Sequence, residues 1–359
     1  MKRISTRNLV PGMVTAEDVF TYNNQLILAK GLVLTDKAIT KLEFYSVLSI
    51  RVEDEVVEVA DEETEAATIS YSQQIQKSPE FIEYKNNFEN TVATFKGSLD
   101  SFLNGDMALD PEEMLTETLD LVTSAGKRVN IFSMIHNMRT YDDLTYSHSV
   151  NVALVCHVIA EWMHLSPEDV KIATLCGLLH DVGKIQIPIE IIKKPSKLTE
   201  QEFAIIKTHT VKGYNILKNC NIDDRVKTAA LMHHERYDGT GYPLGLHGEK
   251  LNVFSQIVAV ADVYEAMTSA RIYRGPWCPF NVLDLFIQEG MQKYNAQVLI
   301  PFMNNIASTY MGYRVKLNNN MEGEIVYINP ENITRPMIRC GEQFIDMSQD
   351  RSLQIVAIK

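Results

Sequence analysis

Apolar residues recur with helical spacing through the middle of the chain. Between Phe81 and Val92 the large apolar residues are three or four positions apart, which is the spacing of one face of a helix. Ser166 followed by Pro167, and Thr199 followed three residues later by Glu202, are helix-start signals. The pattern therefore predicts a mainly helical region over residues 79–310.

The two ends of the chain show short β-type runs between turn residues. We expect an N-terminal α/β module of unassigned role over residues 1–60, with strands near Met13–Val14, Gln25–Leu28 and Ser49–Val52 and a short helix from Thr35. After Gly312 a C-terminal β module is predicted over residues 311–359. Its expected strands are Arg314–Leu317, Glu324–Tyr327, Met337–Arg339 and Leu353–Val356.

An acidic segment separates the N-terminal module from the helices. Residues 53–65 are strongly acidic, and no Lys or Arg occurs between Arg51 and Lys77. Blocks of like charge resist packing, so a solvated linker is expected, with an acidic docking surface as the alternative. The predicted organisation is mainly α: a linker and helical connector over 61–129, and an all-helical domain over 130–310, between the two β-containing modules.

Charge and composition exclude several classes of protein. The chain has 359 residues, with 34 Lys and Arg against 46 Asp and Glu, so a large basic face for duplex nucleic acid is not expected. No apolar run approaches 18 residues, which predicts no membrane span. The five cysteines form no CxxC pair, and the N-terminus has no apolar core of signal-peptide length. We therefore expect a cytoplasmic protein.

Two pairs of titratable residues interrupt apolar helices. His180 and Asp181 end the apolar run 170–179, where Gly183 is predicted to break the helix. His180 alone would be read as a neutral core histidine, but an ionised buried carboxylate beside it needs a partner or a metal. His233, followed by His234, lies seven residues after Val226 on an apolar stripe.

Three further residues extend this set. Asp262 interrupts an apolar helix with no Lys or Arg within one turn, so its cation must come from elsewhere in the fold. His148 and His209 lie on other predicted helices, the latter on the helix begun at Thr199, and each alone is an ordinary helix histidine. Together, imidazoles and carboxylates on four helices match a di-metal site, for which Fe, Mn or Zn is suited. Surface or structural roles are assigned to the other histidines discussed, His136, His157, His164 and His247.

Cations beside such a site favour a phosphoryl substrate. Two metal ions activate water and clamp a phosphoryl group. Lys184 follows His180 by about one turn, and Arg271 and Arg274 follow Asp262. Arginine suits bidentate contact with phosphate, although a solvated helix end is the alternative for these two residues.

With these residues assembled, the chain resembles the HD-GYP family, a branch of the HD-domain phosphohydrolases. The likeness covers roughly residues 130–310. It rests on His180–Ile185 (HDVGKI), Pro188, Lys194–Pro195, His233–Pro243 (HHERYDGTGYP), Ala261–Tyr264 (ADVY) and Arg271–Arg274 (RIYR).

This resemblance implies an all-helical HD-type domain that hydrolyses cyclic di-GMP to linear 5′-pGpG and often onward to GMP. It implies catalytic roles for Asp181 and Lys184, Asp181 bridging two metals and Lys184 lying near the scissile phosphate. Substrate contacts fall on Lys184, Tyr242, Arg271 and Arg274. The implied metal ligands are His148, His180, Asp181, His209, His233, His234 and Asp262.

One departure from the family and several alternatives remain. Some members carry a Glu four residues before the first His and hold a third metal; here that position is Leu144, so we expect two ions, Fe or Mn. Partners expected besides cyclic di-GMP are a cyclic di-GMP synthase or another signalling protein, at the Gly241–Tyr242–Pro243 loop, and a second copy of the chain. A non-catalytic cyclic dinucleotide receptor, and an enzyme for another cyclic dinucleotide such as a mixed guanine–adenine ring, stay open. The Gly-Tyr-Pro loop and the Arg271/Arg274 segment argue against a nucleoside triphosphate hydrolase.

Overall fold

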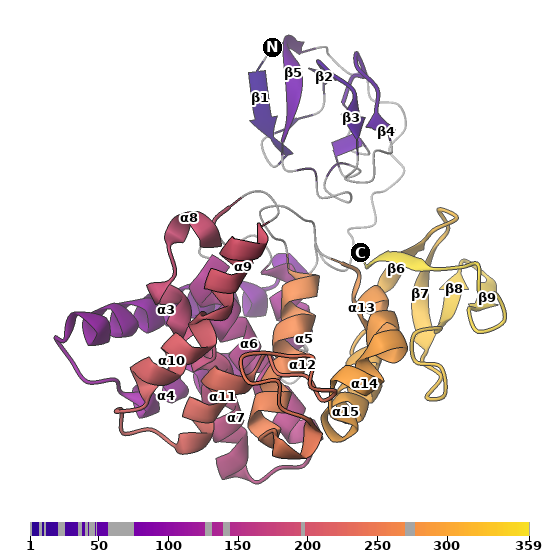
Figure 1. Cartoon of the computed structure of the whole chain (residues 1–359). Helices are drawn as coiled ribbons and strands as arrows, with labels where there is room; N and C mark the ends of the chain where they lie inside the picture. Colours follow the sequence, from indigo (N-terminus) through magenta and orange to yellow (C-terminus); the bar gives the residue numbers. More distant parts are fainter. Residues whose placement is uncertain are drawn as a thin grey trace. The chain divides into compact units, whose positions relative to one another are not determined.

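The computed structural model describes residues 2–6, 9–10, 12–20, 26–34, 38–39, 42, 47, 49–56, 75–125, 131–138, 144–194, 198–269 and 277–358. They form two compact units, one within Met1–Ile69 and one within Ser70–Ser269 and Trp277–Lys359. The fold is mainly helical with small antiparallel sheets at both ends of the chain (Figure 1), which confirms the predicted fold class. Most of the predicted helix from Thr35 and most of the acidic segment lie outside the described residues.

The N-terminal unit contains a three-stranded antiparallel sheet and a hairpin. Strand β5 (Ser49–Val56) lies between β1 (Lys2–Ser5) and β2 (Met13–Thr15), while β3 (Val19–Phe20) pairs with β4 (Leu26–Leu28). Along β5, Ile50 and Val52 are buried and Arg51 between them is exposed, because successive side chains of a strand point to opposite faces. The strands predicted in this part of the chain are confirmed.

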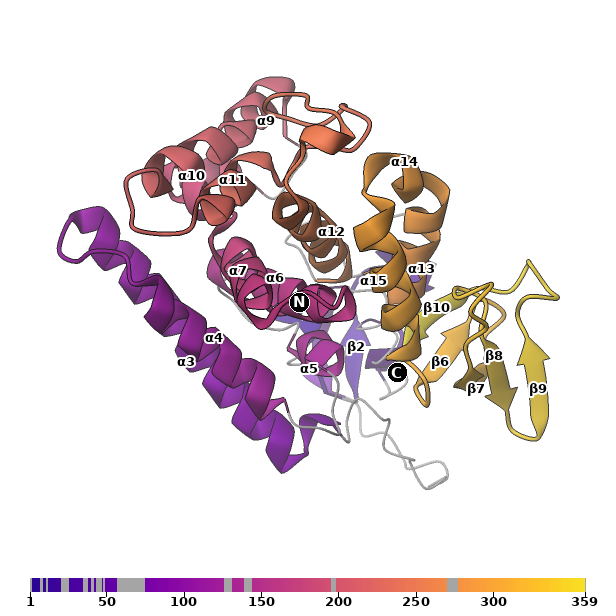
Figure 2. The same ribbon diagram turned by 90° about the horizontal axis from the view of Figure 1, so that it is seen from below.

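The second unit begins with a helical hairpin. Helices α3 (Pro79–Asn104) and α4 (Pro111–Ser124) pack against each other and against α6 (Leu144–Trp162) and α7 (Pro167–Leu179), as Figure 2 shows. Ser78 and Asp110 cap their N-termini through side-chain oxygens, which accept from backbone N–H groups that have no partner within the helix. The apolar face predicted from Phe81 to Val92 is buried, so that prediction is confirmed.

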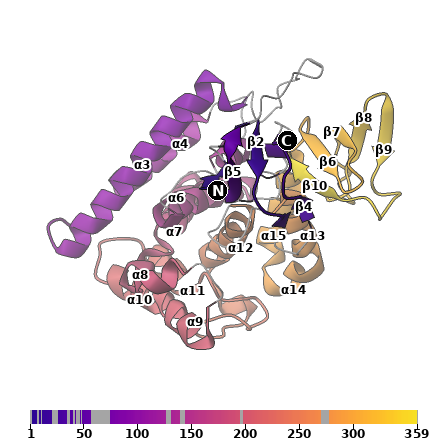
Figure 3. The same cartoon turned by 90° about the horizontal axis from the view of Figure 1, so that it is seen from above.

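The helices that follow surround a fully buried core. They are α5 (Ile131–Asn137), α6 (Leu144–Trp162), α7 (Pro167–Leu179), α8 (Ile189–Ile192), α9 (Glu200–Lys207), α10 (His209–Leu217), α11 (Asp224–Met232), α12 (Val253–Thr268), α13 (Pro279–Leu285), α14 (Met291–Lys293) and α15 (Ala296–Ser308), with 3-10 turns η2 (Val182–Gln186) and η3 (Gly248–Lys250) and a π turn η4 (Phe286–Gly290). Figures 2 and 3 show α12 between the group α9–α11 and the group α13–α15. Helices α6 and α7 approach so closely that a Cβ on Gly177 would lie 2.7 Å from Cα of Ala153.

Two local predictions in this region are wrong. The apolar helix ends at Leu179 as predicted, but Gly183 does not supply the break, because it lies within η2, where a Cβ on it would lie 1.9 Å from the carbonyl oxygen of His209. Gly183 is therefore required by close packing against α10. The helix capped by Thr199 ends at Lys207, and His209 is the first residue of a separate helix.

The C-terminal sheet belongs to the second unit. Strands β6 (Arg314–Leu317), β7 (Glu322–Tyr327), β8 (Met337–Cys340), β9 (Gln343–Asp346) and β10 (Ile355–Ile358) pair antiparallel in the order β10-β6-β7-β8-β9. Val315, Leu317 and Ile338 are buried in the same core as the helices. Strand β9 was not predicted, and the predicted domain boundaries stay predictions. Within the described ranges no helix has the length and apolarity needed to cross a membrane.

Candidate metal centre

The seven predicted ligand residues lie together in the helical unit. Six of them are buried and His234 is partly exposed. Helix ends supply five of the residues, and the other two lie within helices. Their donor atoms form two groups, Asp181 with His209, His233 and His234, and His148 with His180 and Asp262; within each group the atoms lie within 4.8 Å of one another.

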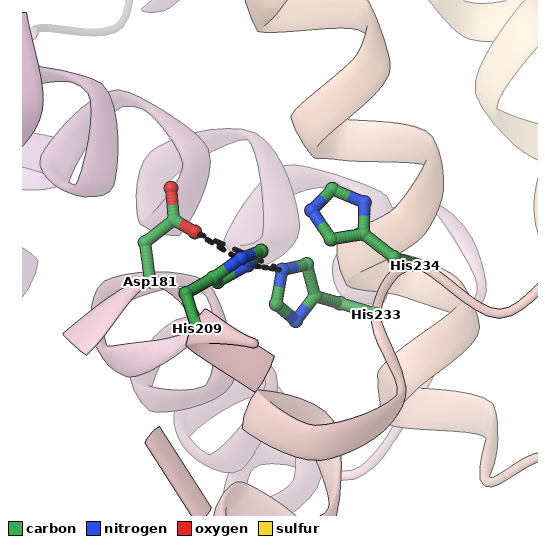
Figure 4. Close-up of side chains that lie close together, drawn as sticks. All are labelled: Asp181, His209, His233 and His234. Atoms are coloured by element: carbon green, nitrogen blue, oxygen red, sulfur yellow. Dashed lines mark hydrogen bonds and ion pairs between the residues drawn. The ribbon is translucent and has the colours of Figure 1, made fainter. Parts of the chain in front are cut away.

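Asp181 lies between the two groups. Its Oδ2 is 3.2 Å from Nε2 of His180 and 3.6 Å from Nε2 of His148. Its Oδ1 is 3.3 Å from Nε2 of His209 and 3.8 Å from Nε2 of His233. Figure 4 shows this carboxylate beside the three imidazoles of its own group. Each oxygen of one carboxylate therefore faces a different set of imidazoles.

Backbone carbonyls fix the orientation of three imidazoles. Nδ1 of His180 lies 2.7 Å from the Gly177 carbonyl, Nδ1 of His209 lies 2.6 Å from that of Ile206, and Nδ1 of His233 lies 3.1 Å from that of Ala229. Because a carbonyl only accepts, each Nδ1 carries the proton, and each Nε2 presents a lone pair to the cluster.

No donor group among the described residues satisfies these lone pairs. Nε2 of His209 and Nε2 of His233 lie 3.2 Å apart, and two acceptors at that distance repel each other. Nε2 of His180 and Oδ1 of Asp181 are buried and have no hydrogen-bond partner in the part of the chain that the structure describes. Unsatisfied buried acceptors are costly, so the arrangement fits a bound cation. The mixed imidazole and carboxylate donors suit a divalent transition metal.

The protonation states also match those of metal ligands. Burial, reinforced by the neighbouring imidazoles, holds the pKa of His233 well below its ordinary value. Burial lowers the pKa of His234 to about 3. Burial opposes ionisation of Asp181, but His180 and Lys184 outweigh it and bring the pKa of Asp181 well below its usual range. Neutral imidazoles and ionised carboxylates are the forms that bind metals.

Glu265 is a site residue that sequence reasoning missed. Nδ1 of His148 donates to Oε2 of Glu265, while Nδ2 of Asn151 and Oγ of Ser269 donate to Oε1 at 3.2 and 2.6 Å. A carboxylate behind a ligating histidine fixes its tautomer and raises its basicity. The available signal was the spacing, because Glu265 follows Asp262 by three residues on one helix face.

Glu235 holds the loop that covers one side of the cluster and was also missed. Its buried carboxylate accepts from the backbone N–H groups of Leu244 at 2.6 Å and of Gly245 and Leu246 at 3.1 Å. A Cβ on Gly241 would lie 2.4 Å from Cα of Glu235, so the loop requires glycine at that position. The loop is therefore held by the Glu235 carboxylate at residues 244–246 and by close backbone packing at Gly241.

Tyr242 on this loop stacks on a ligand residue. Its ring centroid lies 4.7 Å from that of His234, with 30° between the ring planes. Burial raises the pKa of the Tyr242 phenol, so its hydroxyl stays protonated and can donate. The structure thus places the predicted substrate residue Tyr242 beside the cluster.

The remaining predicted residues divide into three sets. Nζ of Lys184 forms an ion pair with Oδ2 of Asp181, which places it at the cluster. Arg271 and Arg274 lie outside the described residues. None of the four histidines given surface or structural roles belongs to either donor group; one of them, His157, is buried and hydrogen-bonded to Thr174.

Comparison with known proteins identifies the family. The model of a family described as "HD domain" matches residues 113–298. A cyclic di-GMP phosphodiesterase of Pseudomonas aeruginosa is 32% identical over 221 residues, covering 61% of this chain and 53% of its own length. One of Thermotoga maritima is 40% identical over 167 residues, covering 46% of this chain and 44% of its own length. The chain belongs to the HD-domain family, in its HD-GYP branch.

A third relative carries a different substrate in its name. A 3′3′-cGAMP-specific phosphodiesterase of Vibrio cholerae is 37% identical over 167 residues, covering 46% of this chain and 39% of its own length. The chain spans about half the length, or less, of these curated relatives.

Proposed function

We propose that this chain is a metal-dependent phosphodiesterase that hydrolyses cyclic di-GMP to linear 5′-pGpG, and onward cleavage to GMP stays open. The observation that carries the proposal is the position of Asp181, whose two oxygens face two separate groups of imidazoles. Family membership and the names of two relatives support the same reaction.

Two divalent ions, Fe or Mn, are the proposed cofactors. One ion would be held by His209, His233 and His234, and the second ion by His148, His180 and Asp262. Asp181 would bridge the two ions. When bound, such a pair supplies an activated water and a clamp for phosphoryl oxygens. The hydrogen bonds from Nδ1 of the histidines keep the Nε2 lone pairs aimed at the cluster before any ion arrives.

The other residues act on the substrate. Lys184 is partly exposed beside Asp181, and we assign it to stabilise or protonate the leaving 3′ oxygen. The protonated hydroxyl of Tyr242 would donate to the dinucleotide. Arg271 and Arg274 are assigned to the second phosphate, because a guanidinium matches phosphate geometry.

Product analysis tests this function directly. The protein is prepared anaerobically, loaded with Fe(II) or Mn(II) and incubated with cyclic di-GMP, and the products are separated by chromatography. Accumulation of 5′-pGpG is expected, and the presence or absence of GMP shows whether a second cleavage follows. Intact substrate after prolonged incubation with either metal would overturn the assignment and favour a non-catalytic receptor, which must still bind cyclic di-GMP.

A mixed guanine–adenine cyclic dinucleotide is the second candidate substrate. The relative of Vibrio cholerae, 37% identical over 167 residues, favours it. Parallel measurements of kcat/KM on the two cyclic dinucleotides distinguish the candidates, and we expect the higher value for cyclic di-GMP.

Protein partners are proposed at the Gly241–Tyr242–Pro243 loop. The next residue, Leu244, is 55% exposed on a loop that Glu235 holds in place. A preformed loop with an exposed apolar tip suits docking of a cyclic di-GMP synthase or another signalling protein. Homodimer formation and a cytoplasmic location stay predictions.

A further inference from the structure

Three aromatic rings form a row from the metal centre to solvent. Tyr242 stacks on His234, and Phe203 meets Tyr242 edge-on, with ring centroids 6.4 Å apart and an interplanar angle of 81°. Phe203 is 47% exposed on α9, although it is a large apolar residue with an aromatic neighbour. One face of the row is therefore available to a ligand that already reaches the metal centre.

A lysine lies over both outer rings. Nζ of Lys207 is 5.3 Å from the ring centroid of Phe203 and 5.9 Å from that of Tyr242. Among the described residues no carboxylate lies within ion-pair distance of Lys207. The acid next to Phe203, Glu202, is already occupied, because it pairs with Lys194 at 2.6 Å and accepts from the backbone N–H of Thr199.

Lys207 lies close in sequence to a ligand residue of the metal centre. Lys207 ends α9, two residues before the ligand residue His209. Among the described residues Lys207 has no carboxylate partner, although the chain as a whole carries a formal charge of −12. An exposed aromatic face together with a cation that has no carboxylate partner in the described part of the chain fits a planar base joined to a phosphate.

We propose that Phe203, Lys207 and Tyr242 form an outer platform that binds one nucleobase of the dinucleotide and its adjoining phosphate. This inference rests on the proposed function and adds the residues that select a dinucleotide over a smaller phosphodiester. Phe203 supplies the stacking face and Lys207 the charge. Tyr242 connects the platform to the metal centre through His234.

The test compares binding and turnover in variants of α9. Phe203→Ala should raise KM for cyclic di-GMP about tenfold, with kcat within about twofold, because stacking on an aromatic side chain contributes to binding of each base. Calorimetry with a phosphorothioate cyclic di-GMP that resists hydrolysis should show the same loss of affinity. Metal content, measured by mass spectrometry, should stay unchanged. Lys207→Met should weaken binding severalfold and reduce its dependence on salt, while Lys207→Arg should retain both.

Two variants separate stacking from simple support of Tyr242. Phe203→Leu keeps an apolar contact with Tyr242 but lacks an aromatic face, so it should behave like Phe203→Ala. Phe203→Trp should restore binding. The matched control is Ile205→Ala, which removes another exposed apolar side chain, 39% exposed, from the same helix and should leave KM unchanged.

The outcomes distinguish this inference from the proposed function. Normal binding in Phe203→Leu or in Phe203→Ala, with an active wild-type enzyme, overturns the platform and leaves the phosphodiesterase assignment in place. A wild-type protein that neither cleaves nor binds cyclic di-GMP overturns both. A loss of bound metal in Phe203→Ala would show that the residue supports the cluster, and it would also overturn the platform.

Discussion

The metal centre and the outer platform are built in opposite ways. His180, His209 and His233 are fully buried, and backbone carbonyls fix each ring. In the platform, Phe203 is 47% exposed, its ring lies edge-on to that of Tyr242, and Nζ of Lys207 lies 5.3 Å from its centroid. Donors for a metal must be fixed in place, whereas a surface that selects a base needs only an accessible face. The two proposals therefore assign the chemistry and the choice of substrate to separate parts of the site.

Removing the central carboxylate should have the largest effect. Asp181→Ala is expected to abolish hydrolysis of cyclic di-GMP, because one oxygen of this carboxylate faces His148 and His180 and the other faces His209 and His233. Activity and metal content are measured together, with circular dichroism to confirm folding. Retained turnover at near wild-type metal content would falsify the bridging assignment.

Changes on the substrate side should leave the metals in place. Arg271→Ala and Arg274→Ala are each expected to raise KM, since a lost charge-assisted contact costs about 1.5–3 kcal/mol. Steady-state kinetics and metal analysis of both variants check this. If KM and kcat stay at wild-type values in both, neither arginine belongs to the site.

Weakening the hydrogen bond that supports His148 should lower metal affinity without abolishing metal binding. Glu265→Gln keeps the shape of the side chain but removes the negative charge behind Nδ1 of His148. Loss of such a partner typically lowers metal affinity by roughly 10- to 100-fold. Titration of the metal-free variant and the metal-free wild-type protein with Mn(II) measures the change in affinity. The exposed Glu161, which lies near His157, supplies the matched control Glu161→Gln, for which no change in affinity is expected.

The ligands could be predicted from the sequence, but the residues that hold them could not. His180, Asp181 and Asp262 are visible because they interrupt apolar helices, and that signal is local. Glu235 acts through hydrogen bonds across a loop, which no periodicity encodes. For Glu265 the spacing from Asp262 gives the helix face, but the contact with His148 on another helix cannot be read from it. The need for glycine at position 183 could not be predicted either, because it arises from the close approach of α10.

The fold shows the same division between local and long-range signals. Buried apolar faces such as that of α3 follow from spacing alone. Strand β9 was missed because its burial does not alternate, and its Phe344 is 63% exposed. Its pairing with β8, from Met337 to Cys340, depends on the sheet rather than on its own sequence pattern.

Acid should destabilise the metal-free protein through the same buried histidines. His233 and His234 have lowered pKa values because of burial, that of His234 being about 3. The unfolded chain takes up protons below about pH 6.5 while the folded chain does not, so the free energy of unfolding falls as pH falls from 6.5. Each histidine contributes about 1.4 kcal/mol per pH unit over this range.

Urea unfolding of the chelated protein at pH 7, 6 and 5 measures this dependence. The lowered pKa of Asp181 contributes in a separate window, below the ordinary carboxyl range near pH 4, so the histidines govern the interval from 6.5 to 4.5. A stability that does not change between pH 7 and 5 would contradict the buried neutral imidazoles. Adding metal at pH 7 should raise the urea concentration at the midpoint of unfolding, because the ion binds only the folded site.

The smallest expected effect concerns the number of metals. Leu144 is the first residue of α6, four positions and about one turn before His148, so a Glu at 144 would share the face of His148. Leucine offers no donor atom, and we therefore expect two ions per chain in the substrate-free enzyme. Metal analysis of protein as isolated, combined with anomalous diffraction, counts them. Leu144→Glu should add a third ion and Leu144→Gln should not, because a charged carboxylate suits a divalent cation better than a neutral amide. A fully occupied third site in the wild-type protein would show that another residue replaces the missing Glu.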